Sequence, residues 1–166
     1  MDNKFEVVYS ELKKMASRSR KYWKGDETLN TTALVHEAFI KLSGASQQFS
    51  NRTHFLKVAG KAMRQVLYNY SEGKLAQKRG GNSEKVAIDQ ADILPINEEN
   101  ANHYVKLEHA IKNLETQDDV FGKIVECRFF GGMTIEETAE ALELSPATVK
   151  RKWNFAKSWL YVELKK

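Results

Sequence analysis

The chain of 166 residues carries a net charge of +4, with 42% hydrophobic and 29% charged residues, which fits one ordinary or two small soluble domains. No apolar run approaches the roughly 20 residues of a membrane span, and the first residues lack the apolar core of a signal peptide, so we expect a cytoplasmic protein without membrane insertion. The single cysteine excludes an intrachain disulfide and a cysteine zinc cluster.

Two amphipathic helices are predicted before residue 44. The first covers 4–20, and its apolar residues recur at spacings of three and four: Phe5, Val8, Leu12 and Met15. The second covers 31–43, with Thr31 or Thr32 as the N-cap. Its apolar stripe consists of Leu34, Val35, Ala38, Phe39 and Leu42.

The longest predicted helix covers about 53–78. Its apolar face consists of Phe55, Ala59, Ala62, Val66 and Tyr70. A second stripe, displaced by two residues, consists of Lys57, Lys61, Arg64 and Tyr68. Two residues correspond to about 200° of helix rotation, so we expect this basic stripe to lie opposite the core face, with Asn51, Arg52 and His54 nearby.

The charge of this first part points to a partner. Residues 1–79 contain 15 Lys/Arg against 7 Asp/Glu, a net charge of +8, whereas residues 80–102 contain 1 against 5, a net charge of −4, and residues 103–166 contain 10 against 10. A basic surface is either simply solvated or binds a polyanion, and charge alone does not decide. The aromatic ring of Tyr68 beside the cations favours nucleic acid, because rings stack on unpaired bases.

A linker is predicted at residues 80–100, which are polar and acidic and contain Gly80, Gly81 and Pro95. The region that follows is predicted to be helical throughout. Its first helix is marked by Leu107, Ile111 and Leu114. The next helix is marked by Val120, Ile124, Val125 and Phe129 and ends at Gly131 and Gly132.

The last two predicted helices have clear start signals. Thr134 caps a helix over 135–142, with Glu137 at the spacing of a capping box. After a turn at Glu143 and Leu144, Ser145 caps a helix that opens with Pro146. The buried stripe of this last helix is expected to be Val149, Trp153, Ala156 and Leu160.

Two helices joined by so tight a turn have the outline of a helix-turn-helix. The polar side chains of the second helix are then the candidates for contact with DNA: Ser145, Thr148, Lys150, Arg151, Lys152, Asn154 and Lys157. Arg and Lys suit guanine edges and phosphates, and Asn suits adenine. The alternative is an ordinary amphipathic helix with a charged face; the turn and the Ser-Pro start favour DNA binding.

Signals of catalysis are weak. His36 and Glu37 begin a match to the HExxH zinc motif that fails at Ile40, and the four histidines lack the spacing of metal ligands. Cys127 lies in an apolar stretch and is interpreted as a small buried hydrophobe. We therefore expect no enzyme, no cofactor and no metal site.

The order of elements and several strings resemble a bacterial RNA polymerase sigma factor of the extracytoplasmic-function (ECF) type. Residues 32–39 (TALVHEAF) resemble the family's acidic-Leu-Val-Gln-Glu-x-Phe segment. Residues 51–64 (NRTHFLKVAGKAMR) and 76–81 (AQKRGG) resemble one ECF subgroup. Residues 145–151 (SPATVKR) and 155–160 (FAKSWL) resemble its C-terminal signature.

The resemblance implies an all-α protein of two small helical domains, 1–79 and 101–166, joined by the acidic linker 80–100, with the helix-turn-helix in the second domain. It implies that one set of residues contacts the clamp helices of core RNA polymerase: Leu34, Val35, Glu37 and Phe39. The loop 44–52 and the third helix would recognise and help open the minus-ten promoter element through Asn51, Arg52, His54, Lys57, Lys61, Arg64 and Tyr68. Residues 145–157 would read the minus-thirty-five element, and the second domain would also touch the polymerase flap.

Partners follow from the same resemblance: core RNA polymerase, promoter DNA and, as an inhibitory partner, an anti-sigma factor. A further hypothesis, without support from any particular residue, is that the two domains pack together in the free protein and hide these surfaces. Two other classes stay open. One is a stand-alone helix-turn-helix regulator that binds duplex DNA by itself, and the other is a helical adaptor that needs no DNA contact.

Overall fold

The computed structural model describes residues 51–78 and 98–166, together with Ala38 and Lys41. The regular elements in these residues are all helices: α3 (Arg52–Lys78), α5 (Glu98–Glu115), α6 (Val120–Val125), the short π-helix η1 (Glu126–Phe130), α7 (Ile135–Leu142) and α8 (Pro146–Leu164). The predicted all-α class is confirmed for this part of the chain. None of the helices in it is long and apolar enough to cross a membrane.

α3 begins and ends within one residue of the predicted helix. Its predicted core face is buried at Phe55, Ala59, Ala62 and Val66, and Tyr70 packs against the same core. A second set of side chains from α3 is even more completely buried: Leu56, Met63 and Leu67. α3 therefore buries a wider arc than the single predicted stripe, because packing partners lie on more than one side of it.

α5 begins at Glu98, inside the segment that the sequence assigned to the linker. Glu98 and Glu99 occupy its first turn, where acidic side chains are stabilised by the positive end of the helix dipole. The predicted apolar face is confirmed, since Leu107, Ile111 and Leu114 are all buried. The last three residues of the predicted linker are therefore helical.

One continuous helix was expected from Val120 to Phe129, but the structure changes from α6 to the π-helix η1 at Glu126. The wider turn is closed by the backbone N–H of Gly131, which donates to the carbonyl of Glu126 at 2.8 Å. Gly131 also leaves no room for a side chain, because a Cβ would lie 2.8 Å from the carbonyl oxygen of Cys127. Gly132 then reverses the chain with a φ of 64°, which glycine adopts without strain.

α7 and α8 follow the sequence prediction closely. The Thr134 side chain accepts a hydrogen bond from the backbone N–H of Glu137, and the Glu137 carboxylate accepts one from the backbone N–H of Thr134. The capping box is therefore complete. Glu143 ends α7 in the left-handed conformation. Ser145 caps α8 by accepting from the N–H of Thr148 at 3.1 Å, and the first helical residue is a proline.

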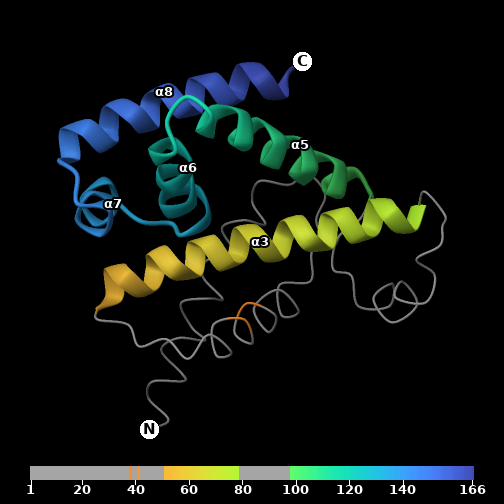
Figure 1. The fold of residues 1–166 in the computed structure, drawn as a ribbon, viewed down its shortest axis with the longest axis horizontal. Coiled ribbons are helices and arrows are strands. Elements are labelled where there is room, and N and C mark those ends of the chain that lie inside the picture. Colours follow the sequence, from red (N-terminus) through yellow and green to blue (C-terminus); the bar gives the residue numbers. More distant parts are fainter. Residues whose placement is uncertain (1–37, 39–40, 42–50, 79–97) are drawn as a thin grey trace, which may run out of the picture.

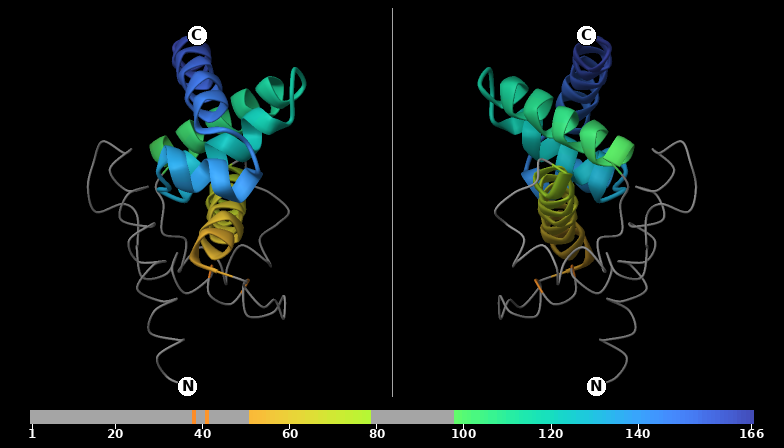
Figure 2. Two further views of the ribbon diagram at one scale, coloured as in Figure 1. Left: turned by 90° about the vertical axis from the view of Figure 1, so that its left-hand side faces the viewer. Right: turned by 90° about the vertical axis from the view of Figure 1, so that its right-hand side faces the viewer.

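The helices pack in layers with α3 on one side and α8 on the other (Figure 1). α5 lies along α3, and α5, α6 and α7 lie between α3 and α8, as the side views also show (Figure 2). One apolar cluster joins Met63 of α3 with Ile111 of α5 and Leu160 of α8. The described parts of the two expected domains therefore share one core, while the domain boundaries stay a prediction.

Candidate nucleic-acid interface

The first candidate surface begins at the N-terminus of α3. Asn51 caps this helix, because its Oδ1 accepts from the N–H of His54 at 2.8 Å. The capping role was missed from the sequence, although an Asn directly before a helix is a known signal for it. About two and three turns further on, Lys57 is half-buried and Lys61 is exposed. The predicted basic stripe is therefore accessible in this part of α3.

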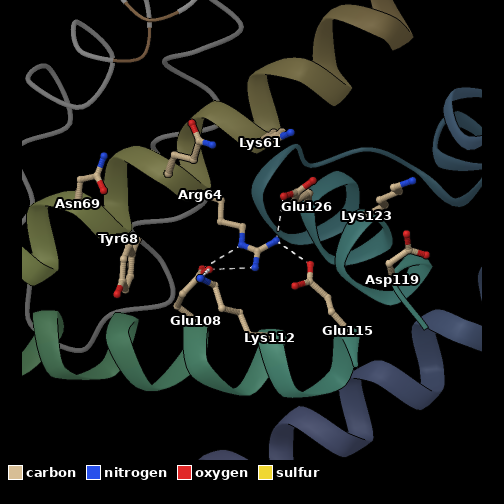
Figure 3. Close-up of a pocket in the computed structure, with 11 residues that line it drawn as sticks. Lys61, Arg64, Tyr68, Asn69, Glu108, Lys112, Glu115, Asp119, Lys123 and Glu126 are labelled. Atoms are coloured by element: carbon tan, nitrogen blue, oxygen red, sulfur yellow. Dashed lines mark hydrogen bonds and ion pairs between the residues drawn. The ribbon is translucent and has the colours of Figure 1, made fainter. Parts of the chain in front are cut away.

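Arg64, the third cation of the predicted stripe, does not face solvent and is only 8% exposed. Its Nε and Nη2 donate to the two carboxylate oxygens of Glu108 at 2.9 and 3.0 Å, which makes a bidentate pair. Its Nη1 donates to Glu126 at 2.9 Å and to Glu115 at 3.2 Å (Figure 3). The expected exposure of the stripe is thus wrong at Arg64, because α5 and η1 cover this edge of α3.

The cluster sets one buried arginine against three carboxylates, with the Nζ of Lys112 also lying 4.0 Å from Glu108, and both burial and charge shift the pKa values. Burial alone would lower the pKa of Arg64, but its hydrogen bonds and Coulomb attraction to Glu108 and Glu115 outweigh burial and raise that pKa. The pKa of Glu126 is also raised, because burial disfavours its charged form more than Arg64 favours it. In this arrangement the carboxylates neutralise the arginine and engage its N–H groups.

Two other candidate residues of α3 contact helices that follow residue 98. Arg52 forms an ion pair with Glu137 of α7, and the Nζ of Lys112 lies 6.0 Å from the centre of the Tyr68 ring. The Tyr68 hydroxyl donates to Glu72 at 3.1 Å. Burial and that carboxylate both raise the pKa of Tyr68. In the described part of the chain, residues after position 98 therefore engage Arg52, Arg64 and Tyr68 among the seven candidates.

A hollow of about 480 Å³ lies beside the Arg64 cluster. Its wall on α3 includes Lys61, Gln65 and Asn69, and its opposite wall includes Lys112 and Lys123 together with the three glutamates. Charges of both signs line the hollow, so its surface is neither uniformly positive nor uniformly negative. Among the described residues, no three His, Cys, Asp or Glu side chains are grouped so that they could hold a metal ion.

The second candidate surface is the first half of α8. Four of its predicted DNA-binding side chains are exposed: Lys150, Arg151, Asn154 and Lys157. Lys157 lies 5.6 Å from the ring centre of Trp153, which is half-buried rather than fully buried as predicted. The predicted inward face is otherwise confirmed at Val149, Ala156 and Leu160. Ser145 and Thr148 are hydrogen-bonded to each other at the start of the helix.

Lys152 departs from the expected solvent-facing set. Its Nζ lies 3.1 Å from Asp118 and 4.9 Å from the ring centre of Phe121. The pKa of Asp118 is lowered, first by the hydrogen bond from the N–H of Val120 and then by Lys152. The prediction that Lys152 is free to reach DNA is therefore wrong in this arrangement, because this side chain ties α8 to the start of α6.

The residues assigned to polymerase contact lie outside the described part of the chain: Leu34, Val35, Glu37 and Phe39. Between them only Ala38 is described, and its side chain is fully buried.

Comparison of the chain with known protein families gives one match. A family model described as ECF sigma factor matches residues 1–166. Neither a curated protein nor a solved structure matches the chain significantly.

Proposed function

Because the chain belongs to the ECF sigma factor family, we propose that it binds core RNA polymerase and selects promoters by reading minus-ten and minus-thirty-five elements. Sigma factors act in transcription initiation, in which the polymerase carries out the chemistry and the sigma factor supplies promoter recognition. The observation that carries the proposal is the family match over the full 166 residues. We further propose that the protein acts in the cytoplasm, where its polymerase and promoter partners are found.

The minus-ten assignment is supported by α3. Lys61 is exposed and Lys57 is half-buried on one side of this helix, where they can neutralise phosphates and so give salt-sensitive affinity. Arg64 and Tyr68 continue the same stripe and would join the DNA contact once α5 and η1 leave this edge of α3. Tyr68 then supplies a ring on which an unpaired base can stack.

The minus-thirty-five assignment is supported by α8. Lys150, Arg151, Asn154 and Lys157 project from a helix that begins directly after a tight turn, and helix-turn-helix proteins read bases from the N-terminal half of their second helix. Polymerase binding by Leu34, Val35, Glu37 and Phe39 rests on the resemblance of the 32–39 segment alone.

Run-off transcription with bacterial core RNA polymerase and a library of random promoters tests the function. Polymerase-dependent, sequence-specific transcripts are the expected result and would reveal both elements. If the protein instead bound a palindromic duplex tightly without polymerase and produced no transcripts, the stand-alone regulator would replace the sigma assignment.

A triple variant tests the role of α3 within this function. Replacing Lys57, Lys61 and Arg64 by alanine is expected to impair promoter opening. The matched control removes three exposed cations away from both surfaces: Lys106, Lys165 and Lys166. Both variants lose three positive charges, and circular dichroism establishes that each is folded at the assay temperature. A specific loss in the folded first variant then assigns promoter opening to α3, and equal opening in the two variants contradicts that assignment.

A further inference from the structure

The carboxylates that hold Arg64 all come from outside α3. Glu108 and Glu115 belong to α5, and Glu126 belongs to η1. Arginine uses the same bidentate fork for carboxylates and for phosphates. In Arg64, Nε and Nη2 donate to Glu108, and Nη1 donates to both Glu115 and Glu126. Both hydrogen-bonding edges of the guanidinium are therefore engaged, and neither can bind a phosphate or a base.

The interface of α3 with α5 and η1, called the seam below, is tightly packed around this cluster. At Gly60 an added Cβ would lie 2.6 Å from the carbonyl oxygen of Glu126 and 3.3 Å from the Cα of Gly131. The backbones of α3 and η1 therefore meet at a distance that only glycine allows. The ion pair of Arg52 with Glu137 continues the seam towards α7.

We propose that this arrangement is a self-inhibited state of the sigma factor. Glu108, Glu115 and Glu126 bind Arg64 of α3 in this state, and promoter DNA binds Arg64 in their place in the active state. The proposal rests on the function proposed above. It makes the second half of the chain a built-in competitor for DNA at the minus-ten surface.

The distance between the two promoter elements supports the need for opening. Elements named for positions −10 and −35 are roughly 25 base pairs apart, which is ~85 Å at about 3.4 Å per base pair. In the structure one layer of helices separates α3 from α8 (Figure 1), and packed helix axes lie about 8–10 Å apart, so their axes are roughly 20 Å apart. α3 must part from α5 and η1 before both helices can reach their elements.

The chain contains its own reporter of this opening. Cys127 is the single cysteine, lies in η1 and is 1% exposed. Burial and the neighbouring Glu126 raise the pKa of its thiol to about 12, against the opposing influence of Lys57 on α3. Because the thiolate is the reactive form, Cys127 reacts slowly with maleimide while the seam is closed and faster once α3 moves away.

The first experiment weakens the seam without altering α3. Glu115→Gln together with Glu126→Gln is expected to raise both the rate of Cys127 labelling by maleimide and the affinity of the free protein for a duplex of the selected promoter, each by about tenfold or more. Glu136→Gln with Glu140→Gln, at two exposed positions of α7, is the control with the same change in charge. Far-ultraviolet circular dichroism establishes that each variant keeps its helices. Equal labelling and equal affinity in the two variants would overturn the proposal.

The second experiment locks the seam. Gln65 on α3 and Lys123 on α6 are exposed and line the same hollow, and neither is assigned to DNA or polymerase. In a Cys127→Ala background, Gln65→Cys and Lys123→Cys are joined by a short bismaleimide that contains a reducible disulfide. The locked protein should lose run-off transcription, and reduction of the linker should restore it.

The two proposals fail in different ways in this assay. If the locked and reduced forms transcribe equally well, self-inhibition is wrong and the sigma function stands. If the wild-type protein with core polymerase gives no promoter-specific transcript, the sigma function is wrong and self-inhibition falls with it.

Discussion

Replacing Gly60 by alanine tests the contact between α3 and η1 most directly. The added Cβ would lie 2.6 Å from the carbonyl oxygen of Glu126, whereas ordinary C···O contacts are about 3.3–3.6 Å, so the two helices must separate by roughly 0.7–1 Å. The three atoms nearest to the added Cβ, the carbonyl oxygen of Glu126 and the N and Cα of Gly131, are all backbone atoms, so no change of rotamer relieves the overlap. Overpacking with a backbone shift costs ~1–3 kcal/mol, and alanine regains ~0.8–1 kcal/mol over glycine in a helix interior. The difference of these terms lowers the free energy of unfolding by about 1 kcal/mol, and by ~2 kcal/mol at most.

Urea unfolding followed by circular dichroism measures this change, with Asn69→Ala as the control. Asn69 is exposed on the same helix, so its replacement tests helix propensity without steric overlap and should stabilise α3 by about 0.5 kcal/mol. Cys127 labelling should also accelerate in the Gly60 variant and stay unchanged in the Asn69 variant. If Gly60→Ala stabilises the protein as Asn69→Ala does, then α3 does not rest on η1 through this contact.

Three further predictions concern charges. Arg64→Ala should lower the free energy of unfolding by ~3–5 kcal/mol at neutral pH, because Glu108, Glu115 and Glu126 lose the arginine that pairs with all three. Titration of urea unfolding should show that the loss shrinks as acid neutralises Glu126, whose pKa is raised; a pH-independent loss would contradict this reason. Burial would raise the pKa of Glu137, but its hydrogen bonds with Thr134 and its ion pair with Arg52 outweigh burial and lower that pKa. The ionised Glu137 side chain therefore stabilises the fold above its ordinary pKa of 4.5, and this contribution is lost as the pH falls through the lower pKa of the folded state. Glu137→Gln should therefore lower stability by about 0.5–1 kcal/mol at neutral pH and make no difference in strong acid, which thermal melts at both pH values would check. Alanine at both Lys150 and Arg151 should reduce the slope of log affinity against log salt by about 1.8 if each neutralises one phosphate, and an unchanged slope in promoter-binding titrations would remove them from the interface.

The elements of the C-terminal half could be predicted from the sequence because their signals are local. A capping box needs only Thr134 and Glu137 three residues apart, and the start of α8 needs only Ser145 followed by Pro146. The predicted and observed starts of these two helices agree for this reason. The π-helix was missed because its cause is not local: Gly131 closes η1 while it lies against α3.

The candidate site was predicted less well than the fold, and Arg64 shows why. Periodicity correctly places Lys57, Lys61 and Arg64 along one side of α3. It does not reveal how wide the buried arc is, because that depends on which helices pack there. Leu67 and Gly60 lie between the core face and the basic stripe and are themselves buried, so the packed surface of α3 extends as far as Arg64. A prediction that assigns one buried face to each helix therefore underestimates the buried surface of a helix that packs on two sides.

The chemistry of the seam is suited to reversible contact. A buried ion pair adds little net stability, since desolvation offsets most of the Coulomb attraction, and Arg64 and its three glutamates regain their hydration when the seam opens. The apolar part of the seam behaves differently, because Met63 and Leu67 of α3 and Ile111 of α5 are fully buried and each such side chain costs about 1.5–3 kcal/mol to expose. Opening therefore needs a partner that covers this apolar surface while DNA replaces the carboxylates on Arg64. Under the function proposed above, core polymerase would cover the apolar surface and promoter DNA would take Arg64, so we expect Cys127 labelling to rise most when both are present.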